Sequence, residues 1–435
     1  MGRFRGISID VRPLRESRPF RLLWIGQTIS GTGNAITVVV VPYQLFELTH
    51  STLMLGLLGL CSLAPLLVAP LVGGAIADAV DRRMLILLSD LSLFVLAALF
   101  AVNAALPHPQ VWALFALVTL ATIFTGLGWP ARRASIPRLV APNQIAAAST
   151  LQGLSGNFSR VAGPALGGLL IAAIGVPAAF LVDAASFGVS IATVLMLPVL
   201  KPPAGAERAS LSSIVEGFRF VRSQKAVLGI FLLDANAMVF GMPRALFPAF
   251  ALLRFGGDAA ILGLLYAAPY AGALVATFCS GWINRIRRMG VGVAVSASAW
   301  GAAIIAFGFS RSLWPALFCL ALAGAADMVS AVLRTVMVVD VTPDSMRGRV
   351  AGIELMQVTG APALGDLEAG GVASATSLRF SVVFGGVACI AGSLLITLAL
   401  PALLRYDALH ARRERIARDT AAGAVFGLPA GGEPR

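Results

Sequence analysis

Residues 73–83 read Gly-Gly-Ala-Ile-Ala-Asp-Ala-Val-Asp-Arg-Arg, and they separate two long apolar runs at about 52–77 and 84–106. Each run is longer than the ~20 residues that an α-helix needs to cross the hydrocarbon core of a bilayer. The stretch between them ends with four charged side chains in six residues. We therefore interpret it as a short polar turn that joins two membrane-spanning helices.

The composition of the whole chain indicates a membrane protein. Of its 435 residues, 58% are apolar and only 12% are charged, which is roughly half the charged share of a soluble domain. The mean hydropathy is +0.86. Too few charges remain to cover a hydrated surface, which excludes a soluble enzyme, a disordered protein, a disulfide scaffold and a nucleic-acid-binding domain. We expect the chain to be surrounded by membrane lipids and to have no nucleic-acid partner.

Twelve apolar runs along the chain are interrupted by charged or turn residues. Because a lipid-facing backbone must satisfy its own hydrogen bonds, and no alternating strand pattern is present, we expect each run to be an α-helix. The prediction is an all-α integral membrane protein with twelve transmembrane helices. The predicted spans are 21–43, 52–77, 84–106, 110–131, 145–172, 177–199, 226–252, 260–283, 290–309, 313–338, 347–371 and 379–403.

The longest polar stretch between spans, 201–225, divides the helices into two sets of six. Two matches indicate a repeat: Leu-Gly-Leu-Leu at 55–58 recurs at 262–265, and Pro-Ala-Leu-Gly at 164–167 recurs at 362–365. Both halves start on the same side, so the repeats are parallel, as in two bundles that rock about a site between them. The predicted divisions are 1–20 (basic N-terminus), 21–200 (first bundle), 201–225 (central loop), 226–403 (second bundle) and 404–435 (C-terminal tail).

The basic residues predict the orientation of the chain. With the N-terminus in the cytosol, 28 of the 33 Lys and Arg residues fall in cytosolic loops and ends. Only Arg254, Arg311 and Arg379 fall on the opposite side, and Arg160 and Arg244 fall within spans. Because positively charged loops stay in the cytosol, we expect both termini on the cytosolic side of the inner membrane of a bacterial-type cell.

Residues 73–83 resemble the signature that follows the second helix in the major facilitator superfamily, G-x-L-A-D-R-x-G-R-K. The Asp-Arg-Arg ending is similar to the drug- and siderophore-exporting branch, while Ala79 and Asp81 replace the usual Arg and Gly. The resemblance implies two pseudo-symmetric six-helix bundles in the major facilitator fold. The matching residues are Gly74, Ala77, Asp78, Arg82 and Arg83.

We expect this loop to act as a gate on the cytosolic side. A glycine permits close helix approach, an Asp at a helix end can cap a neighbouring helix, and an Arg can bridge to it. In the second half Arg285 stands where Asp78 would be, so gating should be asymmetric. An ordinary positively charged loop is the alternative. The candidate gating residues are Gly74, Asp78, Asp81, Arg82 and Arg83.

The fifth predicted helix contains a second motif. Residues 159–168 resemble the antiporter signature of the same superfamily, G-x(3)-G-P-x(2)-G-G, with Ser159 in place of the first Gly. The resemblance implies export by exchange, and plain helix packing is the alternative. In the eleventh helix Asp366 stands where the last Gly would be. The matching residues are Gly163, Pro164, Gly167 and Gly168.

Polar side chains follow one face of the first predicted helix. Because amides facing lipid are unfavourable, we expect this stripe to line the central cavity, with hydrogen bonds between helices as the alternative. Arg160 lies near mid-membrane, where inserting an Arg costs ~2.5–3.5 kcal/mol. It would hold an anionic substrate, steady a carboxylate, or form a fixed structural ion pair. The candidate cavity residues are Gln27, Asn34, Thr37 and Arg160.

Acidic residues within the spans are candidates for proton coupling. Proton-driven carriers need a buried carboxylate whose partner moves, and structural pairing is the alternative. Asp90 and Asp183 lie nearer the span ends, where we expect them to reach interfacial water. Asp327 and Arg334 share a helix face, but two turns apart we expect them to be too distant for direct pairing unless the helix bends. The coupling candidates are Asp234, Asp327 and Glu354.

The sequence offers no catalytic or metal-binding constellation. Its four cysteines lie in apolar runs and its three histidines are scattered, so we predict no metal and no cofactor. It has no serine-hydrolase, zinc-peptidase or phosphate-loop motif, which makes an enzyme such as a membrane-embedded transferase a remote alternative. We expect a monomeric carrier that exports a small molecule, either a drug-like amphipathic solute or a siderophore, against inward proton flow. A uniporter or importer of the same fold is the alternative.

Overall fold

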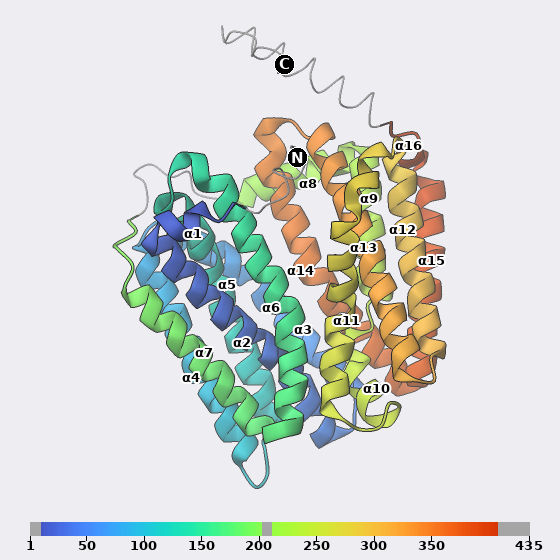
Figure 1. Ribbon diagram of the computed structural model, residues 1–435. Helices are drawn as coiled ribbons and strands as arrows, with labels where there is room; N and C mark the ends of the chain where they lie inside the picture. Colours follow the sequence, from blue (N-terminus) through green and yellow to red (C-terminus); the bar gives the residue numbers. More distant parts are fainter. Residues whose placement is uncertain (1–9, 202–210, 408–435) are drawn as a thin grey trace, which may run out of the picture.

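The computed structural model describes residues 10–201 and 211–407, and within these ranges the chain is helical without β-strands. In the N-terminal half a short helix, α1 (Arg12–Glu16), precedes six long ones, and a 3₁₀ turn, η1 (Pro142–Gln144), precedes α6 (Figure 1). The long helices match the first six predicted spans. They are α2 (Arg18–Thr49), α3 (Thr52–Ala77), α4 (Arg82–Ala105), α5 (Val111–Leu139), α6 (Ile145–Ile174) and α7 (Val176–Leu195).

In the C-terminal half the seventh predicted span, 226–252, is interrupted. Its first helix ends at Phe240, and a 3₁₀ turn begins only at Arg244. Gly241 and Pro243 lie in the break, where a proline cannot supply the helical N–H. The elements of this half are α8 (Leu211–Ser223), α9 (Lys225–Phe240), η2 (Arg244–Leu246), α10 (Phe247–Leu253), α11 (Ala259–Phe278), η3 (Ser280–Arg285), α12 (Met289–Phe309), α13 (Leu313–Val341), α14 (Asp344–Ala375), α15 (Leu378–Ala399) and α16 (Pro401–Leu404).

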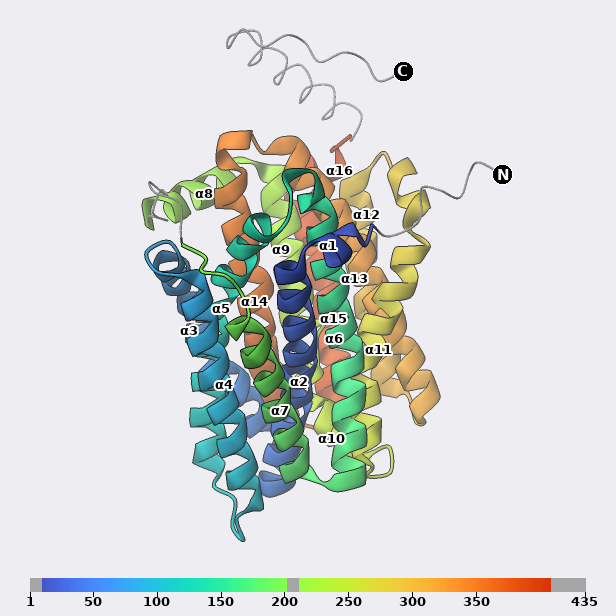
Figure 2. The same cartoon turned by 60° about the vertical axis from the view of Figure 1, so that its left-hand side comes forward.

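Two of the twelve spans are not apolar enough to be recognised as membrane-spanning from length and composition alone. Ten segments of the described chain, with α9 to α10 taken as one, are long and apolar enough to cross a membrane. The remaining two, α2 and α14, are each 32 residues long. Helix α2 carries the polar stripe and lies against α6 and α7 (Figure 2), and α14 packs on α3 and α9. These contacts shield their polar faces from lipid, which lets helices of this composition span a membrane.

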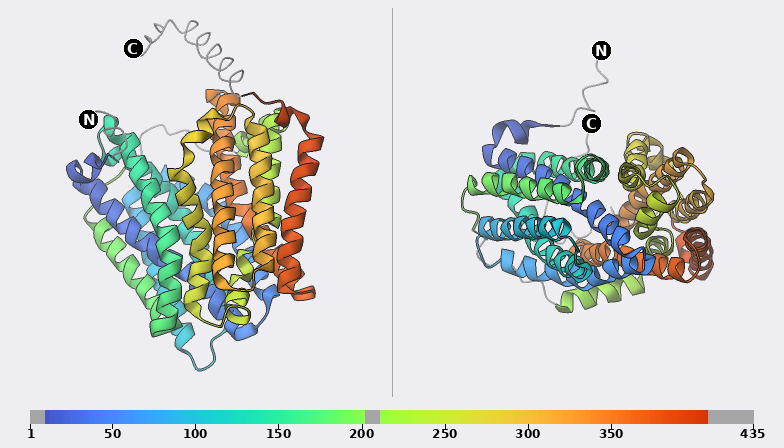
Figure 3. Two further views of the ribbon diagram at one scale, coloured as in Figure 1. Left: turned by 45° about the vertical axis from the view of Figure 1, so that its right-hand side comes forward. Right: turned by 90° about the horizontal axis from the view of Figure 1, so that it is seen from below.

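The long helices of the two halves form two groups, which are seen end-on in the right-hand view of Figure 3. We name the end that holds α1, α8 and α16 the basic end. At the opposite end one apolar core joins both halves, with Phe46 and Phe180 from the first and Phe250 and Phe307 from the second. We name this end of the molecule the sealed end. Toward the basic end each half has a core of its own.

The predicted central loop contains a helix that the sequence analysis missed. Helix α8 packs through Gly217 against Arg349 of α14, and Glu216 forms an ion pair with Arg349 at 2.6 Å. Its opposite face exposes Val215 and Phe218. Thirteen residues are too short to cross a bilayer, so a search for spans overlooks this helix. Residues 202–210, and the predicted tail beyond residue 407, lie outside the described chain.

Candidate functional site

Helices α6 and α11 cross where the halves meet at the sealed end. A Cβ atom added to Gly168 would lie 2.5 Å from the carbonyl oxygen of Ala259, and one added to Gly263 would lie 2.5 Å from that of Pro164. Only glycine allows two backbones to approach this closely. Figure 1 and the left-hand view of Figure 3 show α6 and α11 converging here and separating toward the basic end.

A second crossing joins α3 to α14 at the same end. Gly56 lies against the backbone of Asp366, where an added Cβ would be 2.9 Å from the carbonyl oxygen. One turn further on, the Thr52 hydroxyl donates a hydrogen bond of 3.2 Å to the carbonyl of Gly370. By the internal repeat, Gly56 corresponds to Gly263 of the first crossing. The two crossings are therefore related by the pseudo-symmetry of the halves.

Near the basic end the same helices do not meet. Glycines at 153 and 156 of α6, and at 348 and 352 of α14, have no atom beyond their own helix within 4 Å of an added Cβ. Arg160 is exposed on α6, between the face that packs on α2 and the face that packs on α11. The halves are thus joined at one end and parted at the other, with Arg160 close to where they part.

The predicted gating loop is fastened to the N-terminal half. The Asp81 carboxylate caps α4 by accepting the N–H of Arg83 at 3.0 Å, and it also accepts the N–H of Leu200 at 2.9 Å. Arg82 is only 6% exposed and donates to the carbonyl of Ala134 at 2.9 Å. Asp81 and Arg82 therefore anchor the start of α4, and their hydrogen bonds stay within one half of the described structure.

Asp78 and Gly74 face outward from this loop. The Asp78 side chain is 36% exposed and lies 3.5 Å from Arg82. An added Cβ on Gly74 would meet nothing within 4 Å. Both residues are available for a partner that approaches from the other half. The side chain of Arg285, expected at the equivalent position there, lies outside the described part of the structure.

The antiporter-type motif divides its glycines between two partners. Gly163 and Gly167 pack on α2, against Ala35 and Ile36, within the N-terminal half. Gly168 packs on α11 across the junction. Pro164 lies inside α6, which continues through it. The motif therefore holds α6 tightly on two sides at the sealed end.

The polar stripe of α2 is partly used for contacts between helices. The Gln27 carbonyl accepts a hydrogen bond of 2.6 Å from Gln152 of α6. The Thr37 hydroxyl donates to Asp183 of α7 at 2.5 Å, so it points into the N-terminal half and not into the cavity where we expected it. Asn34 is half-buried. Gln27 and Asn34 remain candidates for the cavity wall.

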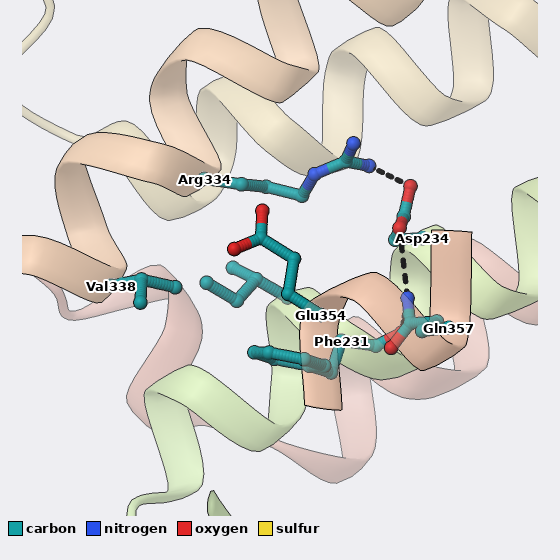
Figure 4. Close-up of a pocket in the computed structure, with 7 residues that line it drawn as sticks. Phe231, Asp234, Arg334, Val338, Glu354 and Gln357 are labelled. Carbon is teal, nitrogen blue, oxygen red and sulfur yellow. Dashed lines mark hydrogen bonds and ion pairs between the residues drawn. The ribbon is translucent and has the colours of Figure 1, made fainter. Parts of the chain in front are cut away.

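Charged residues from three helices converge in the C-terminal half (Figure 4). Arg334 of α13 forms an ion pair with Asp234 of α9, and their side chains are 12% and 6% exposed. The amide of Gln357 on α14 donates to the other oxygen of Asp234 at 2.8 Å. Glu354, one turn earlier, points toward Arg334 in Figure 4. Together with Phe231 these residues border a small pocket.

Asp327 belongs to the same cluster, which corrects one prediction. Its carboxylate lies 4.0 Å from Arg334, although we expected the two to be too far apart for pairing. Seven residues rise about 10.5 Å along a helix, and the long arginine side chain spans most of that distance. Arg334 lies within α13, in agreement with the predicted span 313–338. One guanidinium therefore has three carboxylates around it.

The predictions for Asp90 and Asp183 were wrong, because both are buried. Asp90 is 0% exposed, forms an ion pair with Arg132 of α5, and accepts the Ser190 hydroxyl of α7 at 2.8 Å. Asp183 is 2% exposed and accepts the Thr37 hydroxyl. Both carboxylates tie helices together inside the N-terminal half.

One further ion pair was not predicted. Arg244 of η2 and Asp366 of α14 form three contacts of 2.8 to 3.1 Å, with both carboxylate oxygens engaged. The sequence signals were present: Arg244 falls within a span, and Asp366 replaces a glycine of the repeat. Their pairing was invisible because it depends on the break between α9 and η2.

Comparisons with known proteins agree with this geometry. A family model described as transmembrane secretion effector matches residues 9–418. The enterobactin exporter EntS of Citrobacter koseri is 31% identical over 398 residues, which cover 92% of this chain and 95% of the relative. The protein of the same name from Shigella boydii serotype 18 is 31% identical over 386 residues, covering 87% and 92%.

Solved transporter structures share the fold at low identity. A POT family transporter in complex with 5-aminolevulinic acid superposes with a TM-score of 0.72 at 13% identity, covering 89% of this chain and 97% of the other. A bacterial homologue of the human lysosomal transporter Spinster, in an inward-facing and unoccupied conformation, gives 0.66 at 16% identity, covering 91% and 97%. The fold is therefore the twelve-helix fold of major facilitator transporters, and the chain belongs to the transmembrane secretion effector family of that superfamily.

Proposed function

We propose that this membrane transporter exports an amphipathic organic solute, drug-like or a siderophore, in exchange for protons and by alternating access. Its basic end would face the cytosol, as the distribution of Lys and Arg predicts. The structure then corresponds to the state that receives substrate from the cytosol. The observation that carries the proposal is the cluster of three carboxylates around Arg334.

The charge balance of this cluster favours proton exchange. Asp234, Asp327 and Glu354 share one guanidinium, so full ionisation would leave two more negative charges than Arg334 can balance in a partly buried cluster. Burial and like-charge repulsion both favour protonated carboxylates. Protonation of Asp234 would weaken its ion pair and release Arg334 toward the other two acids. Loading and release of protons would in this way change contacts among α9, α13 and α14.

The two ends of the molecule suit a rocking motion. Glycine crossings seal one end, while the glycines of the same helices near the basic end are uncovered. Closure of the basic end would bring the C-terminal half toward Gly74 and Asp78, which face outward now. The gate would then hold the cytosolic side shut while the opposite side opens.

The substrate would bind between the halves near Arg160. This side chain is exposed on α6 close to where the halves part, and its guanidinium suits an anionic group. Gln27 and Asn34 of α2 would add amide contacts. The relatives named as enterobactin exporters support a siderophore as the first candidate, and the amphipathic drug-like class is the second.

The proposal is tested by flux in proteoliposomes. Purified protein would be reconstituted with an imposed proton gradient, and transport of siderophores and of lipophilic cations would be followed together with internal pH. We expect uphill substrate movement coupled to opposite proton movement, abolished by a protonophore. A substrate that only equilibrates across the membrane, independently of the proton gradient, would instead identify a uniporter. Substrate movement in the same direction as the protons would identify an importer.

A further inference from the structure

The proposed transport cycle does not use the Arg244–Asp366 pair at the sealed end. By the internal repeat, Asp366 stands where the antiporter-type motif has Gly168. Gly168 closes against α11 with backbone on backbone. Asp366 instead brings a charged side chain to the matching crossing of α14 with α3. The two crossings thus have equivalent positions but different chemistry.

Helix α3 covers this carboxylate with glycines. Asp366 is 7% exposed. Its Cβ lies 2.8 Å from where a Cβ of Gly59 would be, and its carbonyl oxygen lies 2.9 Å from the equivalent point on Gly56. Both glycines belong to the N-terminal half, whereas Asp366 and Arg244 belong to the C-terminal half. The Asp366 carboxylate is therefore shielded from water by the half that would move away.

Arg244 is held in place by the break in the seventh span. It is the first residue of η2, and its carbonyl accepts a hydrogen bond of 3.2 Å from the hydroxyl of Tyr266 on α11. Its Nε and Nη2 atoms engage both Asp366 oxygens, while its side chain is still 36% exposed. The guanidinium thus already borders accessible space on one side.

We propose that the Arg244–Asp366 pair favours opening of the sealed end, and we name it the release element. The inference rests on the alternating access proposed above. Removing ions from water is unfavourable even when they are paired. Separation of α3 from α14 would hydrate Asp366, the buried member of the pair, and relieve its share of that penalty, whereas separation of the Gly168 crossing only loses packing. One crossing therefore assists opening while the other resists it.

The proposal predicts an order of three variants. Asp366→Asn leaves Arg244 unpaired in the closed crossing, so the sealed end should open more than in the wild type. Arg244→Gln combined with Asp366→Asn removes both charges and their desolvation penalty, so it should open less. If the pair instead stabilises the closed crossing, by holding Asp366 in the shape that packs on α3, the double variant should open more than the wild type.

The measurement is the distance between spin labels across the sealed end. Labels at His108 and Arg311, which are exposed in the α4–α5 and α12–α13 loops, belong to different halves. The distances would be measured by double electron–electron resonance on protein in nanodiscs. The labels would be placed in a cysteine-free variant that transports as the wild type does. We expect the long-distance population to rise at least about threefold in Asp366→Asn and to fall about threefold in the double variant.

The matched control is the Asp90–Arg132 pair, which lies within one half. Asp90→Asn with Arg132→Gln also removes a buried ion pair but should leave the distances unchanged. If Asp366→Asn does not fold, the exchange Arg244→Asp with Asp366→Arg keeps both charges, and we expect it to open more than the neutral double variant. A neutral double variant as open as the wild type, or more open, overturns the release element. If the wild type itself never shows the long distance with substrate and a proton gradient, alternating access fails instead.

Discussion

Each half of the molecule holds an Arg–Asp pair that links its long helices, Asp90–Arg132 in the N-terminal half and Asp234–Arg334 in the C-terminal half, and the surroundings of these two pairs differ. In the N-terminal half Asp90 is fully buried, and Arg132 and the Ser190 hydroxyl satisfy it. In the C-terminal half Asp234 shares Arg334 with two further carboxylates, beside a pocket. One guanidinium matched to one carboxylate makes a fixed brace. A surplus of carboxylates leaves charges that protons can neutralise, which is what a coupling site requires.

The largest effect is expected when the pair in the C-terminal half is neutralised. Asp234→Asn keeps the size of the side chain and a group that can contact Gln357, but it removes the carboxylate bound to Arg334. We expect proton-driven export per folded molecule to fall by about tenfold or more, because Arg334 loses the partner whose protonation would release it. Flux in proteoliposomes measures this. Near-normal coupled export would show that Asp234 only braces its helices.

The same change in the N-terminal half should affect stability instead. Asp90→Asn leaves Arg132 without its carboxylate in a buried position, and breaking such a pair costs about 3–5 kcal/mol. Thermal unfolding in detergent should shift to a lower temperature, while export per folded molecule stays within about twofold. If export collapses although the protein remains folded, the distinction between brace and coupling site is wrong.

The fold could be predicted because the membrane imposes simple rules on the sequence. A bilayer requires apolar runs of a set length, so the predicted span 52–77 coincides with α3 (Thr52–Ala77). The interruption of the seventh span was missed, since apolar residues continue across it. Gly241 and Pro243 were the available signals, but glycine and proline also occur inside intact helices here, as Pro164 does in α6.

The candidate site was only partly predictable for a different reason. Residue types identified Asp234, Asp327 and Glu354 as unusual within spans, because charges in lipid are unfavourable. Their shared partner Arg334 was not identified, since it lies on a different helix from Asp234 and two turns from Asp327. The partner of Thr37 was missed for the same reason. Its place on a polar stripe is visible in the sequence, whereas its bond to Asp183 depends on how α2 and α7 pack.

A smaller effect is expected at the exposed edge of the cluster. Asp327 is 34% exposed and lies 4.0 Å from Arg334, so solvent screens their attraction. We expect Asp327→Asn to lower proton-driven export by about threefold, less than Asp234→Asn, because Asp234 can still hold Arg334. Parallel flux assays on the two variants measure the ratio. An equal or greater loss at Asp327 would make it the principal proton carrier and Asp234 its structural support.

The smallest effect should come from Glu354, and it concerns the pH profile more than the rate. Its side chain points toward Arg334 but sits at the pocket wall, one turn from Gln357 (Figure 4). When several carboxylates share one guanidinium, they titrate together and not as independent sites. Glu354→Gln removes one of them, so export measured against pH at a fixed gradient should change less steeply, with the maximal rate within about twofold. Gln357→Glu is the opposite test, because it adds a carboxylate beside Asp234 and should make the profile steeper. If neither variant alters the slope, Arg334 and Asp234 act as a closed pair like Arg132 and Asp90, and the surplus of acids in the C-terminal half is not what distinguishes it.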